Sequence, residues 1–158
     1  MPNFCDNVLY LKHKDYSQLE RARKAAKEGE LLEEFVPMPL NLKMGDDWYN
    51  WAVKYWGTKW DISLTDVHYH SEAAELVLFF ETAWSPPIEW YRKMEELGFE
   101  LTAYYNEFGM AFCGSYENGC HDTYDYPDED ISGIPEEIVK AFDLDLWVEN
   151  LKQSENNA

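Results

Sequence analysis

Residues 62–107 constrain the fold of this chain most, because two strand patterns, a helix pattern and a third strand pattern follow one another there. Residues 62–70 alternate apolar and polar side chains, with a phase slip near Thr65 that predicts a β-bulge. Residues 75–84 form a strand pattern in which the side chains of both faces are apolar as far as Phe80. This is typical of a strand covered on both faces. This succession predicts a sheet with a helix crossing over it.

The helix between these strands has a start, a buried stripe and an end that the sequence predicts. Ser85 is the expected N-cap, with Pro86 at the first helical position. Gly98 is expected to end the helix, and the third strand follows it. The apolar stripe at helical spacing consists of Ile88, Tyr91, Met94 and Leu97.

The N-terminal part contributes one strand and two helices. Residues 8–11 form a short apolar run that predicts the first strand. Ser17 and Glu20 have the spacing of a capping box, which predicts a helix that begins there and ends at Gly29. Residues 30–35 predict a second, short helix.

Asn118-Gly119 is a pair preferred in two-residue hairpin turns. Such a turn places Glu117 opposite Cys120 and Cys113 opposite Tyr124. Cys113 and Cys120 are then more than about 10 Å apart along the strands, at about 3.3 Å per residue. This exceeds the limit of about 7 Å for a disulfide, so the cysteines are expected to be reduced.

The order strand, helix, insert, strand, strand, helix, strand matches a ferredoxin-like split βαβ unit, which is an α+β sandwich. One domain is expected over residues 1–158, with the ferredoxin-like core in residues 1–116. A tryptophan-rich insert occupies residues 40–61. Residues 117–158 form an acidic C-terminal extension, in which the hairpin is followed by a helix over residues 134–152.

Six motifs within residues 1–114 resemble the YubB-like ferredoxin-like family, which consists of small proteins carried by plasmids and phages. The motifs are Met1-Pro-Asn-Phe-Cys-Asp-Asn7, Val36-Pro-Met-Pro39, Trp48-Tyr-Asn-Trp51, Tyr55-Trp-Gly-Thr-Lys-Trp-Asp61, Thr82-Ala-Trp-Ser-Pro-Pro87 and Tyr105-Asn-Glu-Phe-Gly-Met-Ala-Phe112. Phe4 stands where Trp is common in the family, and Tyr55 where Asn is usual. The resemblance implies a ferredoxin-like fold and a mobile-element origin, without an assigned chemistry. The residues beyond Glu117 have no firm counterpart in that family.

The chain carries 13 Lys and Arg against 31 Asp and Glu, a formal net charge of −18. This charge argues against direct binding to nucleic acid or to an anionic membrane, because phosphate groups are repelled. No signal peptide is recognisable, and the longest apolar run, residues 76–80, is far shorter than the roughly 20 residues of a membrane span. A cytoplasmic location with reduced cysteines is therefore expected.

Residues 117–150 hold eleven acidic side chains and one lysine, Lys140. One interpretation is a solvated surface that keeps the protein soluble. The other is a partner-binding face whose carboxylates imitate DNA phosphates, which repeat at about one charge per 1.7 Å of duplex. Such a face fits a basic nucleic-acid groove on another protein. The residues assigned to this acidic face are Glu117, Asp122, Asp125, Asp128, Glu129, Asp130, Glu136 and Glu137.

Four of the seven tryptophans lie within residues 48–60. They form either a small core that ties the insert to the sheet or an aromatic pocket for a planar ligand. Lys59 is expected to lie between Trp56 and Trp60 by cation–π contact, and to form an ion pair with Asp61. The residues of this alternative site are Trp48, Trp51, Trp56, Lys59, Trp60 and Trp84.

No metal and no cofactor are expected. His68 and His70 share one strand face and offer two imidazoles, but a third ligand has to come from His121 or Glu81. Residues 128–133 resemble the start of a calcium loop that lacks its bidentate Glu at the last position. A turn leading into the last helix accounts for this segment better.

The protein is expected to be non-enzymatic, because the sequence shows neither a nucleophile elbow nor a Gly-rich phosphate loop. The first hypothesis is an inhibitor, from a phage or plasmid, of a host nuclease or another nucleic-acid-binding defence protein. This anti-CRISPR or anti-restriction activity would rest on partial DNA mimicry. The second hypothesis is a module that binds a nucleotide or another small ligand through the tryptophan-rich insert.

Overall fold

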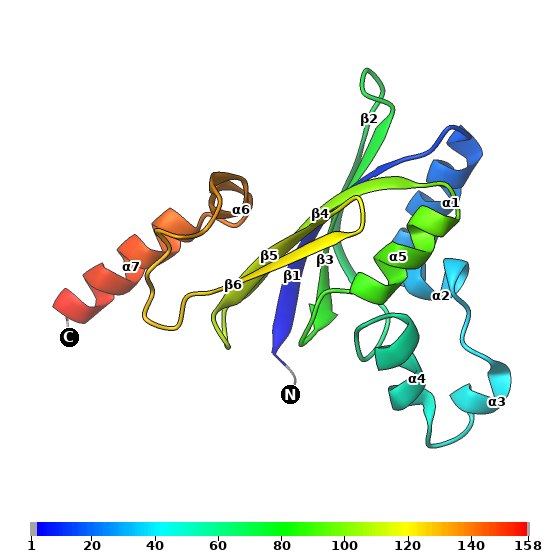
Figure 1. Ribbon diagram of the computed structural model, residues 1–158, viewed down its shortest axis with the longest axis horizontal. Coiled ribbons are helices and arrows are strands. Elements are labelled where there is room, and N and C mark those ends of the chain that lie inside the picture. Colours follow the sequence, from blue (N-terminus) through cyan, green and yellow to red (C-terminus); the bar gives the residue numbers. More distant parts are fainter. Residues whose placement is uncertain (1–2, 158) are drawn as a thin grey trace.

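A computed structural model describes residues 3–157 and contains a six-stranded sheet in the order β2-β3-β1-β4-β5-β6 (Figure 1). The strands are β1 (Phe4–Lys12), β2 (Ser63–His70), β3 (Glu75–Ala83), β4 (Glu100–Glu107), β5 (Phe112–Glu117) and β6 (Cys120–Asp125). The helices are α1 (Tyr16–Lys27), α2 (Leu31–Phe35), α3 (Leu40–Lys43), α4 (Trp48–Tyr55), α5 (Ile88–Glu96), α6 (Glu136–Ala141) and α7 (Leu144–Asn156).

The first four strands have the order of a ferredoxin-like sheet. Strand β1 lies between β3 and β4 and is antiparallel to both. The connection through α1 therefore joins strands separated by β3, and α5 joins strands separated by β1, as two interlocked split βαβ units require. The hairpin of β5 and β6 extends the sheet beyond β4. The prediction of an α+β ferredoxin-like fold is confirmed.

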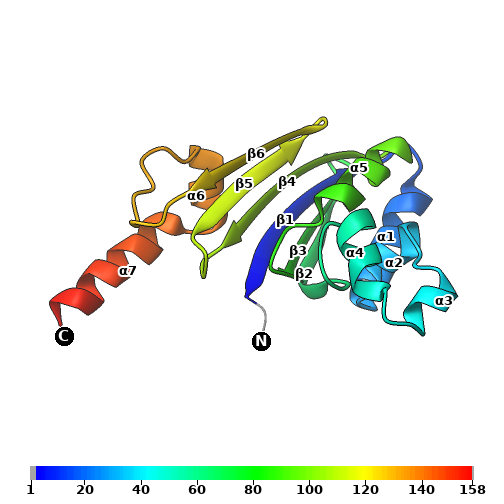
Figure 2. The ribbon, with the colours of Figure 1, turned by 60° about the horizontal axis from the view of Figure 1, so that its bottom comes forward.

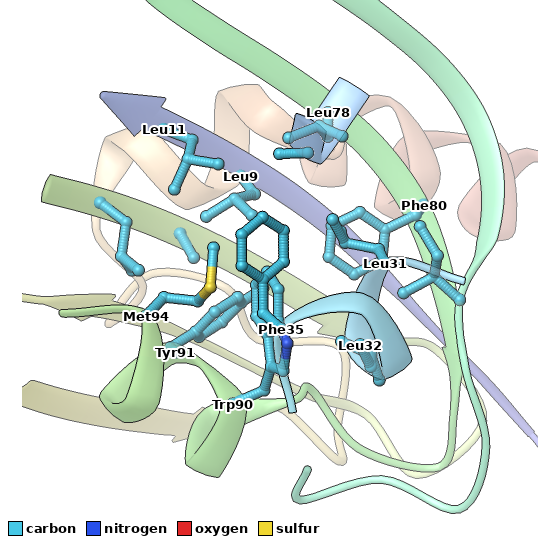
Figure 3. Close-up of a cluster of buried hydrophobic side chains, with 14 of the residues drawn as sticks. Leu9, Leu11, Leu31, Leu32, Phe35, Leu78, Phe80, Trp90, Tyr91 and Met94 are labelled. Atoms are coloured by element: carbon cyan, nitrogen blue, oxygen red, sulfur yellow. The ribbon is translucent and has the colours of Figure 1, made fainter. Parts of the chain in front are cut away.

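The sheet has a helix face, covered by α1, α2 and α5, and an opposite, open face (Figure 2). Successive residues of a strand point to opposite faces, so β1 directs Leu9 and Leu11 to the helix face and Val8 and Tyr10 to the open face. Leu9 and Leu11 are completely buried beside Leu78 of β3 and side chains of α2 and α5 (Figure 3). Burying one such side chain contributes about 1.5–3 kcal/mol, so this layer is the main source of stability.

A second, smaller core lies on the open face, where α6 packs over β4 and β5 and α7 follows it. Tyr126 and Leu144 are buried there, and the Tyr126 hydroxyl donates a hydrogen bond to Asn106 Oδ1. The Trp147 ring of α7 lies 5.2 Å from the Phe108 ring and 5.6 Å from the Tyr126 ring, measured between centroids. The last helices therefore cover the β4–β5 side of the open face.

Two local predictions about the strands are confirmed. The register of β2 against β3 shifts next to Asp66, where the bulge is expected. Asn118 and Gly119 have φ angles of 51° and 80°, as a type I′ turn requires, and Cys113 lies opposite Tyr124. All three cysteines are free.

The predicted start of the first helix is wrong. Helix α1 is capped by Asp15, whose Oδ1 atom accepts hydrogen bonds from the Ser17 backbone N–H (2.9 Å) and hydroxyl (2.7 Å). Ser17 therefore lies inside the helix, and Glu20 pairs with Arg23 instead of closing a capping box. The aspartate prevails because its carboxylate also interacts favourably with the positive end of the helix dipole.

Helix α5 begins at Ile88, later than predicted. The Ser85 hydroxyl donates to the Gly57 carbonyl oxygen (2.7 Å) and so does not cap the helix. Leu97 of the predicted stripe is 44% exposed, whereas Trp90, which the stripe omits, is completely buried. Trp90 is buried because α2 packs against it, a contact between distant segments that helical spacing does not reveal.

The predicted helix over residues 134–152 is interrupted. Asp143 adopts a left-handed conformation (φ 49°), which separates α6 from α7. Aspartate tolerates this conformation better than most residues do. The interruption allows α6 to pack on β4 and β5 while Trp147 of α7 contacts Phe108.

Candidate binding surfaces

A groove runs along β1 on the open face of the sheet. It consists of three adjoining hollows, of which the first and second share Ala141 and the second and third share Tyr10. From Asp6 to Lys12 it follows about 20 Å of strand. We call this the open-face groove; its charged lining consists of Asp6, Glu75, Glu81, Glu100, Glu117, Glu137 and Asp143, with Lys12 and Lys140. Its apolar and aromatic lining includes Val8, Tyr10, Phe79, Tyr104 and Phe142.

Asp6 and Glu81 face each other at one end of this groove. They are directly opposite in the register of β1 and β3, which places their Cβ atoms about 5 Å apart on one face. Among residues 3–157, neither carboxylate forms an ion pair with a Lys or Arg. Burial, and then the negative charges of Glu81 and Glu107, raise the pKa of Asp6 above its ordinary value. Like charges held opposite each other destabilise the folded state at neutral pH.

We expect Asp6→Asn to increase the free energy of unfolding at about pH 7 by roughly 0.5–1 kcal/mol, because it removes this repulsion. The raised pKa means that protonation of Asp6 favours folding. That contribution is fully present below the unfolded pKa of about 3.8 and is lost as the pH rises through the folded pKa. The advantage of the variant should therefore shrink as the pH falls and vanish below about pH 4.

Thermal denaturation of both proteins across this pH range measures the effect. Asp128→Asn is the matched control, because Asp128 is exposed and the substitution makes the same charge change. A melting temperature of Asp6→Asn below that of the unmodified protein at neutral pH would contradict the repulsion.

Tyr104 lies in the middle hollow of the groove, near two carboxylates. Its ring packs edge-on against that of Tyr10, with centroids 6.2 Å apart. Burial, followed by the charges of Glu137 and Glu117, raises the pKa of Tyr104. The hydroxyl therefore stays protonated at neutral pH and can donate a hydrogen bond to a ligand.

The structure divides the eight predicted acidic-face residues between two places. Glu117 and Glu137 line the open-face groove, and the other six lie outside its lining: Asp122, Asp125, Asp128, Glu129, Asp130 and Glu136. Asp122 and Asp125 project to opposite faces of β6, because they are three residues apart in a strand. Within residues 117–157, the only ion pair joins Lys140 to Glu136 at 2.9 Å. The remaining carboxylates of this segment are not neutralised by a lysine or arginine of the described chain.

The predicted aromatic cluster is divided as well. Trp56 is buried, donates its indole N–H to the Val36 carbonyl oxygen (2.8 Å) and packs edge-on against Trp51. Trp48 and Trp51 are partly buried at the margin of the main core. These three tryptophans therefore attach the insert to the domain.

Trp60 and Trp84 are instead 38% and 43% exposed. The Lys59 Nζ atom lies 4.6 Å from the centre of the Trp60 ring and 4.9 Å from that of Trp84, so the expected contact of Lys59 with Trp56 is wrong. Trp84 has a φ of 67°, which is rare for a bulky residue, and its backbone N–H donates to the Asn3 carbonyl oxygen (2.8 Å). We call Trp60, Lys59 and Trp84 the aromatic patch.

The predicted ion pair of Asp61 with Lys59 is also wrong. The Asp61 carboxylate accepts hydrogen bonds from the backbone N–H groups of Leu32 and Glu33, at 2.9 Å each, and of Ile62 at 2.8 Å. It thereby caps the start of α2 from a position 29 residues away from Leu32. The unpaired amides at a helix start bind a partly buried carboxylate more strongly than a solvated lysine does.

Among the described residues 3–157, no group of three or more His, Cys, Asp or Glu side chains is arranged to hold a metal ion. The His68 and His70 rings lie 6.5 Å apart on the edge strand β2. His121 belongs to β6, at the opposite edge of the sheet, and cannot complete a site with them. In the turn of residues 128–133, the Asp130 carboxylate accepts a backbone hydrogen bond.

Five carboxylates of the open-face groove do not belong to the acidic face that the sequence predicts: Asp6, Glu75, Glu81, Glu100 and Asp143. Four of them come from β1, β3 and β4 and meet only because these strands are neighbours. The sequence signal that could have revealed Asp6 is the alternation in β1. Asn7 and Leu9 are buried on the helix face, and the residues next to them point to the open face. Combined with the ferredoxin-like strand order, this alternation places Asp6 and Glu81 on one face.

The fold and the groove define a ferredoxin-like domain with an acidic, partly covered open face. A family model described as the ferredoxin-like domain in Api92-like protein matches residues 59–145, and the chain belongs to this family. The match extends from the residues before β2 into α7. The matched range thus includes the β5–β6 hairpin and α6.

No curated protein and no solved structure matches the chain. Among residues 3–157, no helix has both the length and the apolar character needed to cross a membrane.

Proposed function

We propose that this chain is a non-enzymatic acidic protein that binds a basic, nucleic-acid-binding surface of another protein and blocks it. The partner proposed is a host nuclease or another defence protein of the CRISPR or restriction type. The resemblance to YubB-like proteins supports an origin in a plasmid or phage and action in the bacterial cytoplasm.

The excess of unpaired carboxylates carries this proposal. The formal net charge is −18, and residues 117–150 contribute eleven acidic side chains, of which only Glu136 pairs with a lysine within the described segment. Carboxylates that are not neutralised internally are free to meet the Lys and Arg side chains of a nucleic-acid groove. Their collective field also accelerates association with a basic partner and weakens as salt rises.

A displacement assay tests the proposal. The chain serves as bait in a bacterial lysate at low and at high salt. Each captured protein is then purified and allowed to bind labelled duplex DNA. We expect added chain to displace the DNA, and Asp128→Asn combined with Glu129→Gln and Asp130→Asn to require about tenfold more protein. Asn retains the Oδ1 acceptor with which Asp130 closes its turn.

The matched control combines Glu28→Gln, Glu30→Gln and Glu72→Gln. These exposed residues lie outside the acidic segment, and the triple change removes the same number of charges. The control should displace DNA as well as the unmodified chain does. If the chain and DNA bind the captured protein together, or if the two triple variants behave alike, mimicry through this segment is wrong.

The aromatic patch supports a second candidate function, the binding of a nucleotide or another small ligand. Trp60 and Trp84 present exposed rings on both sides of the Lys59 ammonium group, which is an arrangement suited to an anionic, planar molecule. Binding of such a ligand should depend little on residues 128–130. Partner-independent quenching of tryptophan fluorescence by nucleotides, lost in Trp84→Ala, would favour this function over mimicry.

A further inference from the structure

We infer that the open-face groove is a docking site for a basic, extended segment of a partner protein. The inference rests on the proposed function, because it takes the partner to be a basic protein and states which part of that partner the chain binds. Four of its seven carboxylates, Asp6, Glu75, Glu81 and Glu100, lie outside residues 117–150, whose acidic side chains carry the proposed function.

Over residues 3–157, the helix that packs on the open face, α6, contacts β4 and β5, and no helix packs over the β1–β3 part of that face. Helix α6 packs on β4 and β5, and the interruption at Asp143 brings the α6–α7 junction to the rim of the groove. The hollows on either side of Ala141 have volumes of about 300 and 600 Å³. The half-buried rings of Tyr10, Phe79 and Tyr104 line these hollows. An open sheet face with such a lining can accommodate an extended peptide.

The charge of the groove identifies the occupant. Seven carboxylates line it against two lysines, and both lysines are engaged: Lys140 pairs with Glu136 at 2.9 Å, and Lys12 lies 4.0 Å from Glu75. A nucleic acid or an acidic peptide is repelled by this lining. Lysine and arginine side chains are attracted by it, so the charge complementarity selects a basic segment.

The pair of Asp6 and Glu81 adds a specific contact. Their carboxylates face each other across β1 and β3 without a cation from the described chain. A guanidinium group presents donors in a planar fork that can bridge two carboxylates. An arginine placed between Asp6 and Glu81 would relieve their repulsion, so the repulsion in the free protein favours an occupied groove.

The distribution of charge along the groove sets the layout of the segment. Asp6, Glu81 and Asp143 lie at one end, and Glu75, Glu117 and their neighbours lie at the other, with aromatic rings between. The intervening distance of about 20 Å corresponds to six residues of extended chain. A segment with basic residues at both ends and apolar residues in its middle therefore fits better than a uniformly mixed one.

The probe for the test is the acetylated, amidated and fluorescently labelled peptide Arg-Arg-Val-Val-Arg-Arg, and its control is the isomer Val-Arg-Arg-Arg-Arg-Val. Fluorescence anisotropy at low salt measures binding to the full chain. Asp6→Asn with Glu81→Gln should weaken binding of the first peptide by about tenfold. A control that also removes two charges, Glu28→Gln with Glu30→Gln, should change it less than about twofold.

A second variant tests the groove without changing its charge. Ala141 is the residue shared by two hollows, so Ala141→Trp should obstruct the groove and weaken the peptide. Circular dichroism establishes that each variant is folded. Equal weakening by both double variants, equal binding of the two peptides, or unchanged binding by Ala141→Trp would each overturn the docking site.

The peptide assay contains neither DNA nor the natural partner, so the two proposals fail separately. If the peptide binds as expected but the variant of residues 128–130 displaces DNA normally, the proposed function fails and the docking site stands. If the groove variants bind the peptide normally while residues 128–130 control DNA displacement, the docking site fails and the proposed function stands.

Discussion

Gly114→Ala is expected to destabilise the protein by about 3 kcal/mol or more, because the added methyl group has no space. A Cβ atom at this position of β5 would lie 2.5 Å from Tyr105 Cζ and would overlap both the Tyr105 hydroxyl and the Asp122 carbonyl oxygen. One obstacle is a buried ring of β4 and the other is the backbone of β6. Relief therefore requires the three strands to separate.

The Tyr105 ring cannot turn aside. It is buried, and its hydroxyl shares hydrogen bonds with His121 Nε2 (2.7 Å) and Thr123 Oγ1 (2.8 Å) on β6. Denaturant unfolding followed by circular dichroism measures the loss. Gly133→Ala is the control, because nothing lies within 4 Å of its added Cβ, and it should change stability by less than about 0.5 kcal/mol. Equal stability of the two variants would show that the strands accommodate the methyl group.

The glycine in β5 illustrates how far the sequence predicts this fold. A glycine inside a strand pattern indicates a close approach by another group, but it does not identify that group. Tyr105 crosses over Gly114 only because β4 and β5 pair with these two residues in register. Information of this kind comes from strand pairing, which no local pattern contains.

Features set by neighbouring residues were predictable. The bulge next to Asp66 follows from a break in the alternation of apolar and polar side chains. The Asn118-Gly119 turn follows from the backbone conformation that these two residues favour. The order of strands and helices then leads to the ferredoxin-like topology, because few arrangements satisfy short, right-handed connections.

Features set by distant partners were not predictable. Ser85 bonds to Gly57 instead of capping a helix, and Trp90 is buried by α2. The acidic residues appeared as one C-terminal group in the sequence. The sheet instead gathers Asp6 and Glu81, from β1 and β3, into the groove and leaves most of the C-terminal carboxylates outside its lining.

Asp61→Ala is expected to decrease the free energy of unfolding by about 2–4 kcal/mol. The carboxylate accepts three backbone hydrogen bonds, from Leu32 and Glu33 at the start of α2 and from Ile62 just before β2. Alanine leaves these amides without an acceptor, and it also releases the connection between α2 and the start of β2. The loss should therefore exceed that of an ordinary helix cap.

Asp61→Asn separates the contribution of geometry from that of charge. Leu32 and Ile62 donate to Oδ1, whereas Glu33 donates to Oδ2. Asparagine keeps the first acceptor and places an amino group opposite the Glu33 N–H, so a loss of about 1–2 kcal/mol is expected. Hydrogen exchange at the Leu32 and Glu33 amides should accelerate in the same order as the stabilities. The control is Asp46→Ala, an exposed aspartate of the insert, and a similar loss there would contradict the role of the three hydrogen bonds of Asp61.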